Sequence, residues 1–64
     1  MCGDRRLHLH AELLLVAGDL EGMAESVTTT PSINADGIIF NAMEYRAKRI
    51  REIVAQLMDL EAAD

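Results

Sequence analysis

The sequence predicts an all-α fold in which two helices fold back as an antiparallel hairpin and two hairpins associate into a four-helix bundle. Apolar residues recur at alternating spacings of three and four along both halves of the chain, as they do on helices packed side by side. Pro31 and its polar neighbours separate the two halves. The 64 residues allow one small domain, residues 1–64, and the composition is rich in aliphatic residues with only 3% aromatic ones.

The first predicted helix covers about residues 5–27. Asp4 is its expected N-cap, because a short acceptor side chain at that position satisfies free backbone amides. Gly18 and Gly22 each cost roughly 1 kcal/mol relative to alanine, so a break at either one stays an alternative. The pair Gly18-x-x-x-Gly22 also suggests that another helix approaches closely there. The line expected to face the second helix contains Leu9, Leu13, Val16, Leu20, Met23 and Val27.

The predicted connection covers about residues 28–36. Three threonines and then Pro31 end the first helix, and the next helix is expected to start between Ser32 and Asp36, among several residues that can cap it. Two short strands, 27–30 and 37–40, are the alternative. It is disfavoured because neither run alternates and no strong hairpin turn joins them.

The second predicted helix covers about residues 37–62. Its expected contact line contains Phe40, Met43, Ala47, Ile50, Val54 and Leu57. A second apolar line on one flank contains Ile39, Ile53 and Leu60, with Arg46 in the remaining place. A turn near residues 31–32 sets an antiparallel register. That register places Leu9 opposite Val54 and Glu12 opposite Arg51, with Asp19 near Arg46.

The chain carries more apolar residues than two helices can bury against each other. A chain of this length buries only about 60% of the surface that its unfolded form exposes, and the single cysteine, Cys2, cannot form a disulfide within it. An exposed apolar patch usually marks an interaction surface. We therefore expect a homodimer, a contact with a different protein, or both. The predicted interaction residues are Leu7, Leu14, Leu15, Ile53, Met58 and Leu60, with Arg46, Arg49 and Arg51 tuning orientation and association rate.

Signatures of catalysis are missing from the sequence, which contains no glycine-rich phosphate loop and no Ser/His/Asp set. We therefore expect neither an enzyme nor a bound cofactor. His8 and Glu12 have a spacing suited to one metal ion, but they supply two ligands where zinc sites need three or four, so no metal is expected. Cys2 is interpreted as incidental, because no activating base accompanies it.

The expected function is that of a small non-enzymatic regulator or adaptor that binds another protein through an apolar helix face, as antiactivators, antitoxins and inhibitors do. The alternative is a dimeric nucleic-acid-binding regulator that uses the basic cluster Arg46, Lys48, Arg49 and Arg51. The net charge of −5 and the acidic residues of the first helix argue against it. The longest apolar run, 13–17, is far too short to span a membrane. With no targeting segment expected and one unpaired cysteine, we expect a cytoplasmic location.

Overall fold

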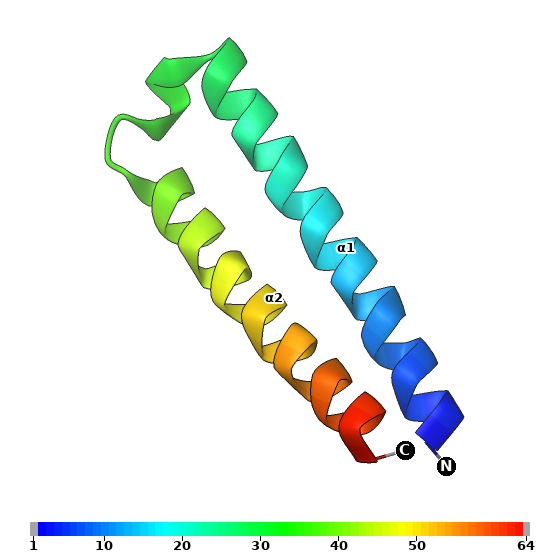
Figure 1. Ribbon diagram of the computed structural model, residues 1–64. Coiled ribbons are helices and arrows are strands. Elements are labelled where there is room, and N and C mark those ends of the chain that lie inside the picture. Colours follow the sequence, from blue (N-terminus) through cyan, green and yellow to red (C-terminus); the bar gives the residue numbers. More distant parts are fainter. Residues whose placement is uncertain (1, 64) are drawn as a thin grey trace.

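The chain forms a helical hairpin in the computed structural model, which describes residues 2–63, with side chains from residue 3 to residue 62. Helix α1 covers Cys2–Thr29, a short 3-10 helix η1 covers Pro31–Asn34, and helix α2 covers Ile38–Ala63. The two long helices lie side by side and run antiparallel, so that α1 begins where α2 ends (Figure 1). The predicted hairpin is confirmed.

Helix α1 is longer than the sequence predicts at both ends. It begins at Cys2, so Asp4 lies in its first turn instead of capping it, where a negative charge still favours the helix N-terminus. It passes through Gly18 and Gly22 without a break. At its other end the Thr28 hydroxyl donates to the carbonyl of residue 24 at 2.8 Å, which lets a β-branched residue stay helical. The strand alternative is therefore wrong for 27–30, and 37–40 is helical from residue 38.

The turn positions α2 through one side chain. Pro31 is the first residue of η1, as suits a residue without a backbone N–H. Asn34, one of the predicted capping residues, accepts hydrogen bonds at Oδ1 from the amides of Ile39 at 2.9 Å and Phe40 at 3.1 Å. Gly37 has a φ of 73°, in the left-handed region that favours glycine. These contacts start α2 at Ile38.

Replacing Asn34 by alanine is expected to lower the free energy of unfolding by about 1 kcal/mol, because two amides in the first turn of α2 lose their acceptor. Urea denaturation followed by circular dichroism measures the loss. Asn41→Ala, at an exposed site within α2 itself, is the control and should change stability by less than about 0.5 kcal/mol. Equal effects of the two substitutions would contradict this role of Asn34.

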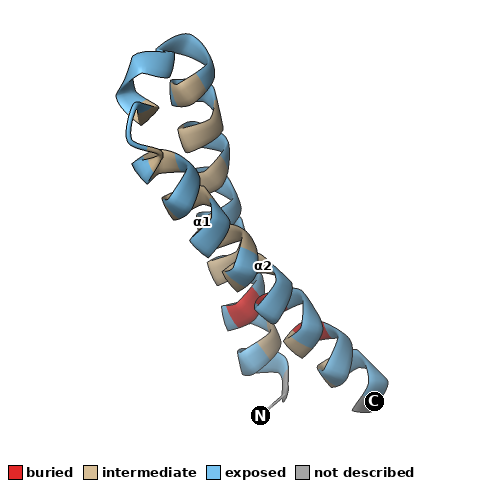
Figure 2. Ribbon diagram, turned by 90° about the vertical axis from the view of Figure 1, so that its left-hand side faces the viewer, coloured by how far each residue is buried: buried red, intermediate tan, exposed pale blue. Residues whose placement is uncertain are grey.

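The core lies at the end of the hairpin away from the turn. Among the described side chains, the buried hydrophobic ones are Leu9, Ile53 and Leu57, and Leu13 and Leu60 pack against them. Figure 2 shows this buried region, in red, close to the start of α1 and the end of α2. Toward the turn, no described side chain is fully buried.

Helix α2 faces α1 with a different side from the one that its sequence predicts. Of the predicted contact line, Leu57 is buried, but Phe40 is 57% exposed and Val54 is 40% exposed. The predicted contact of Leu9 with Val54 is replaced by a cluster of Leu9 with Ile53 and Leu57. The second line turns inward at Ile53, which is fully buried beside Leu9, while Leu57 of the first line keeps its predicted place in the core. Ile53 and Leu60 are therefore core residues and not exposed interaction residues.

The hairpin is a rod with a large surface for its mass. Its principal extents are 47 × 14 × 13 Å and its radius of gyration is 14.7 Å, whereas a compact domain of this length has about 11 Å. It exposes 4852 Å², whereas a compact protein of 7.1 kDa exposes about 4,100 Å². Two helices alone leave an excess of roughly 750 Å² in water.

Candidate protein-interaction site

The outward side of α1 carries three exposed leucines. Leu7, Leu14 and Leu15 are 71%, 75% and 72% exposed, although a leucine is among the residue types most often buried. Met58 on α2 is also exposed. These four are the predicted apolar interaction residues that lie on the surface of the hairpin.

Small residues lie between and beyond these leucines on the same side of α1. Ala11 is four residues after Leu7 and four before Leu15, and Gly18 and Gly22 continue the row. We call Leu7, Ala11, Leu15, Gly18 and Gly22 the outer face of α1. A Cβ atom added at either glycine would meet nothing within 4 Å. The packing of α1 against α2 therefore does not require glycine at these positions. These five residues are uncharged and exposed, and the same row of α1 ends in an acidic residue on each side, Asp4 before Leu7 and Glu25 after Gly22.

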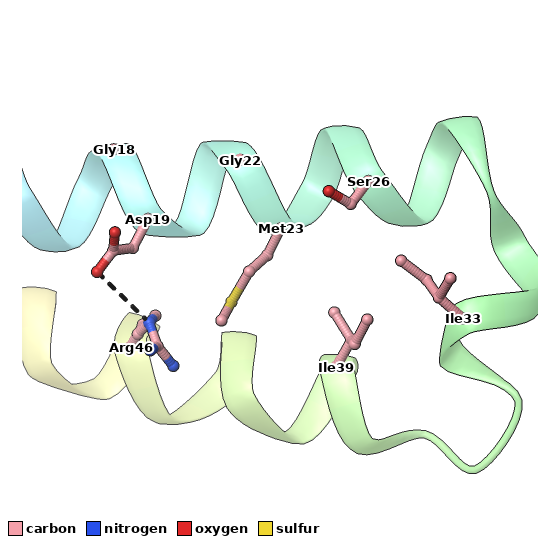
Figure 3. Close-up of a pocket in the computed structure, with 8 residues that line it drawn as sticks. All are labelled: Gly18, Asp19, Gly22, Met23, Ser26, Ile33, Ile39 and Arg46. Atoms are coloured by element: carbon pink, nitrogen blue, oxygen red, sulfur yellow. Dashed lines mark ion pairs between the residues drawn. The ribbon is translucent and has the colours of Figure 1, made fainter.

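A shallow hollow of about 500 Å³ adjoins the outer face near the turn (Figure 3). Gly18 and Gly22 border it along α1, and Met23 reaches from α1 toward α2 between the Asp19–Arg46 pair and the isoleucines near the turn. Its complete lining is Gly18, Asp19, Gly22, Met23, Ser26, Ile33, Ile39 and Arg46. Because it shares both glycines with the outer face, the two form one continuous surface.

Polar contacts between described side chains join the two helices along their length. Arg49 forms a two-point ion pair with Glu12, with Nε–Oε2 and Nη2–Oε1 distances of 2.6 and 2.7 Å. Arg46 lies 3.9 Å from Asp19, as the sequence predicts. The Arg5 guanidinium donates to the Gln56 side-chain oxygen at 3.0 Å. The predicted partner of Glu12, Arg51, is wrong.

The register explains why Arg49 replaces Arg51. Turning Ile53 toward α1 carries Arg49, four residues earlier on the helix, to the side that faces Glu12. Arg51 then points outward and is exposed. Since the hydrogen bonds from Arg49 stabilise the ionised carboxylate, the pKa of Glu12 is lowered from its ordinary value of 4.5.

The ion pair makes stability depend on pH in a defined direction. Above the ordinary pKa of 4.5, Glu12 is ionised in the folded and unfolded states, and pairing stabilises the folded one. As the pH falls through the lowered pKa of the folded state, the carboxylate takes up a proton and this gain is lost. We expect Glu12→Gln to lower the melting temperature at about pH 7 and to match the wild type at about pH 2. Melting curves across this range measure it.

Glu21→Gln removes the same charge at an exposed site of the same helix and is the matched control. At about pH 7 its melting temperature should lie closer to that of the wild type than the melting temperature of Glu12→Gln does. A difference between wild type and Glu12→Gln that stays constant down to about pH 2 would contradict the ion pair as its origin.

The basic cluster is partly neutralised within the hairpin. Arg46 pairs with Asp19, and Arg49 pairs with Glu12 and lies 4.0 Å from Glu52. Lys48 and Arg51 remain on the exposed side of α2. Because two of its guanidinium groups already face carboxylates, the structure adds no support to the nucleic-acid-binding alternative.

The sequence also raises the questions of a metal site, of the Cys2 thiol and of a membrane-spanning helix. In the part of the chain that the structure describes, no three His, Cys, Asp or Glu side chains lie together as a metal site, and Glu12 is held by Arg49. The side chain of Cys2 lies outside the described residues. Neither α1 nor α2, over the residues described, is long and apolar enough to cross a membrane.

The two broad sides of the hairpin differ in polarity. On α2, Tyr45, Arg49, Glu52 and Gln56 recur at spacings of four and three and border the side with the ion pairs. On the opposite flank of the same helix, Met43, Ala47, Ile50 and Val54 recur at the same spacings and are half-buried or exposed. On the corresponding flank of α1 lie Leu13, Ala17, Leu20 and Ala24. We call these two apolar rows together the broad apolar face.

Comparison with known proteins adds no relative to this description. No family model matches the chain, and no match to it was found among curated proteins or solved structures. The functional argument therefore depends on the surfaces described above.

Proposed function

We propose that this chain is a small non-enzymatic regulatory or adaptor protein that works as a homodimer and binds another protein through the outer face of α1. The observation that carries the proposal is the row of leucines on α1, each more than 70% exposed on a helix that has no need of them for its own core. A contiguous apolar surface in water is unfavourable, and proteins that carry one generally bury it against a partner.

The shape of the outer face favours a helical partner. Gly18 and Gly22 leave the backbone of α1 open to close approach, and Leu7 and Leu15 supply anchors along the same row. A helix with its own apolar face lies well against such a row, with side chains at helical spacing inserted between the leucines. The hollow beside Met23 offers room for one larger side chain of the partner.

An inhibitory or antitoxin-like action follows from this mode of binding. A rod of 47 Å that covers a helix of another protein prevents that helix from meeting its usual contacts. Of the three predicted basic interaction residues, Arg46 faces Asp19 and Arg49 faces Glu12. The exposed Arg51 is therefore the one whose charge is left to attract an acidic partner and speed association. The cytoplasmic location stays a prediction from the sequence.

In the proposed homodimer, the second hairpin covers apolar surface that a single hairpin leaves exposed to water. Two hairpins packed as a four-helix bundle give each helix a second neighbour, the usual solution for amphipathic helices with wide apolar stripes. Sedimentation equilibrium should report twice the mass of one 7.1 kDa chain. A folded species of single mass at high concentration would contradict this part of the proposal.

A double variant, Leu7→Glu with Leu15→Glu, tests partner binding. Glutamate favours helix, so it preserves α1 while placing charges on the outer face. The control is Tyr45→Glu, a substitution at a site that is 76% exposed on the other helix. Each protein is used as bait in an extract of its native host, and captured proteins are identified by mass spectrometry. We expect one partner to be captured by the wild type and the control and lost with the double variant.

Binding of that partner is then measured with purified proteins by calorimetry. The double variant should bind at least about tenfold more weakly than the control, since two buried leucine contacts are lost. Equal affinities would contradict binding through the outer face. Circular dichroism spectra of the three proteins show whether each one is folded.

A further inference from the structure

The proposed homodimer leaves open which side of the hairpin meets the second copy, and the distribution of apolar and charged rows answers this. We infer that a second copy of this chain covers the broad apolar face, the side opposite the ion pairs. The inference deepens the homodimer part of the proposed function and rests on it. It leaves the outer face of α1 free for a different protein.

The first argument is the contrast between the two flanks of α2. Arg49 and Val54 are five residues apart, which turns the helix by about 140°, so they point to opposite flanks. On the flank of Arg49, the guanidinium group forms its ion pair with Glu12 within the hairpin. The flank of Val54 carries Met43, Ala47 and Ile50 and meets nothing in the single chain that would bury it fully.

The second argument is the periodicity of that apolar flank. Phe40, Met43, Ala47, Ile50 and Val54 recur at alternating spacings of three and four, the pattern of a row that packs along another helix. The hairpin buries no residue of this row fully, because Ile53 and Leu57 face α1 instead. A helix from a second copy accounts for the pattern.

The third argument is area. One hairpin exposes roughly 750 Å² more than a compact protein of its mass, and a stable interface of standard size removes about 800 Å² from each partner. Covering one broad side of a rod 47 Å long by an interface of that size would lower the surface exposed per chain to about that of a compact protein of 7.1 kDa. The excess surface matches one interface on each chain.

The fourth argument is that the face complements itself. With a two-fold axis across the rods, each α2 lies antiparallel to the α2 of the second copy. Centring this pair between Ala47 and Ile50 places the smallest side chain of the row opposite Ile50 of the second copy, and Met43 opposite Val54 of the second copy. The α1 row of Leu13, Ala17, Leu20 and Ala24 borders the same face and adds apolar surface to it. Large over small lets two helices interdigitate.

Sedimentation equilibrium of Val54→Glu beside Tyr45→Glu tests the face. The two sites are nine residues apart on α2, two and a half turns, so they point to opposite sides of one helix. We expect the wild type and Tyr45→Glu to have twice the single-chain mass, and Val54→Glu to fall to the single mass or to unfold, because a charge would be buried at the interface.

A mixing experiment keeps the inference testable if Val54→Glu does not fold alone. In the inferred register, Lys at position 43 of one chain faces Glu at position 54 of the other. Met43→Lys and Val54→Glu should therefore form a mixed dimer when combined, even though each alone is weakened, and native mass spectrometry detects it. No mixed dimer would overturn the inferred register.

The outcomes separate this inference from the proposed function. If Val54→Glu keeps the double mass together with the wild type, the homodimer stands and the broad apolar face is the wrong side. If the wild type itself is a folded single chain, the homodimer falls and the inference falls with it. Loss of partner binding in the outer-face variant Leu7→Glu with Leu15→Glu, while the double mass is kept, supports separate surfaces for the two contacts.

Discussion

Replacing Ile53 by alanine is expected to lower the free energy of unfolding by about 2–5 kcal/mol, the cost of removing a fully buried aliphatic side chain and leaving a cavity. Ile53 is 0% exposed and forms the buried cluster with Leu9 and Leu57. No other described side chain is as fully buried, so little remains to compensate for the loss. Urea denaturation at fixed protein concentration measures the change.

Leu15→Ala is the control for this truncation. Leu15 is 72% exposed, so the same kind of shortening should change stability by no more than about 0.5 kcal/mol. If Ile53→Ala cost as little as Leu15→Ala, α2 would not face α1 through Ile53, and the side of the helix that contains Val54 would have to be the inner one. The comparison therefore tests the rotation of α2 directly.

Replacing Gly18 and Gly22 together by alanine is expected to raise the free energy of unfolding by about 2 kcal/mol, close to 1 kcal/mol for each glycine in a helix interior. Both lie inside the continuous helix α1, and an added Cβ atom meets nothing within 4 Å. For a chain of this size, such a gain corresponds to a rise of roughly 8–16 °C in melting temperature. Thermal unfolding at matched concentration measures it.

Gly37→Ala provides a control of opposite sign. Gly37 has a φ of 73°, a conformation that costs other residues roughly 1–2 kcal/mol, so the same substitution should destabilise the hairpin. A stability loss in the Gly18 and Gly22 variant would show that these glycines already contact something in the free protein. In the proposed complex, the two added methyl groups should weaken partner binding while the double mass is kept.

Alanine at Gly18 and Gly22 is thus expected to raise the stability of α1 and to weaken the proposed partner binding. Alanine at Gly18 and Gly22 would strengthen the helix, yet glycine keeps the outer face open beside Leu15. Residues that lower stability without a role in the fold often serve a contact made elsewhere. The proposed partner helix on this row would explain why glycine stands at both positions. The inferred second copy on the other side would bury the apolar surface that a single hairpin leaves exposed.

Much of the hairpin could be predicted from the sequence because its causes are local. The spacing of apolar residues determines that both halves are helical, and Pro31 with Asn34 determines where the chain reverses. The antiparallel arrangement then follows, and with it the ion pair of Asp19 with Arg46. Leu7, Leu14 and Leu15 were placed on the surface for the same reason, since they lie off the row that contains Leu9.

The rotation of α2 about its own axis was decided only by tertiary packing. The sequence contains two adjacent apolar rows on this helix, and spacing alone cannot say which of them faces α1, since both repeat with helical period. In the structure Ile53 packs against Leu9 in place of Val54, and the same rotation makes Arg49 instead of Arg51 the partner of Glu12. The rotation of α2 is determined by its packing against α1. Local preferences within α2 are the same for either row and therefore cannot determine it.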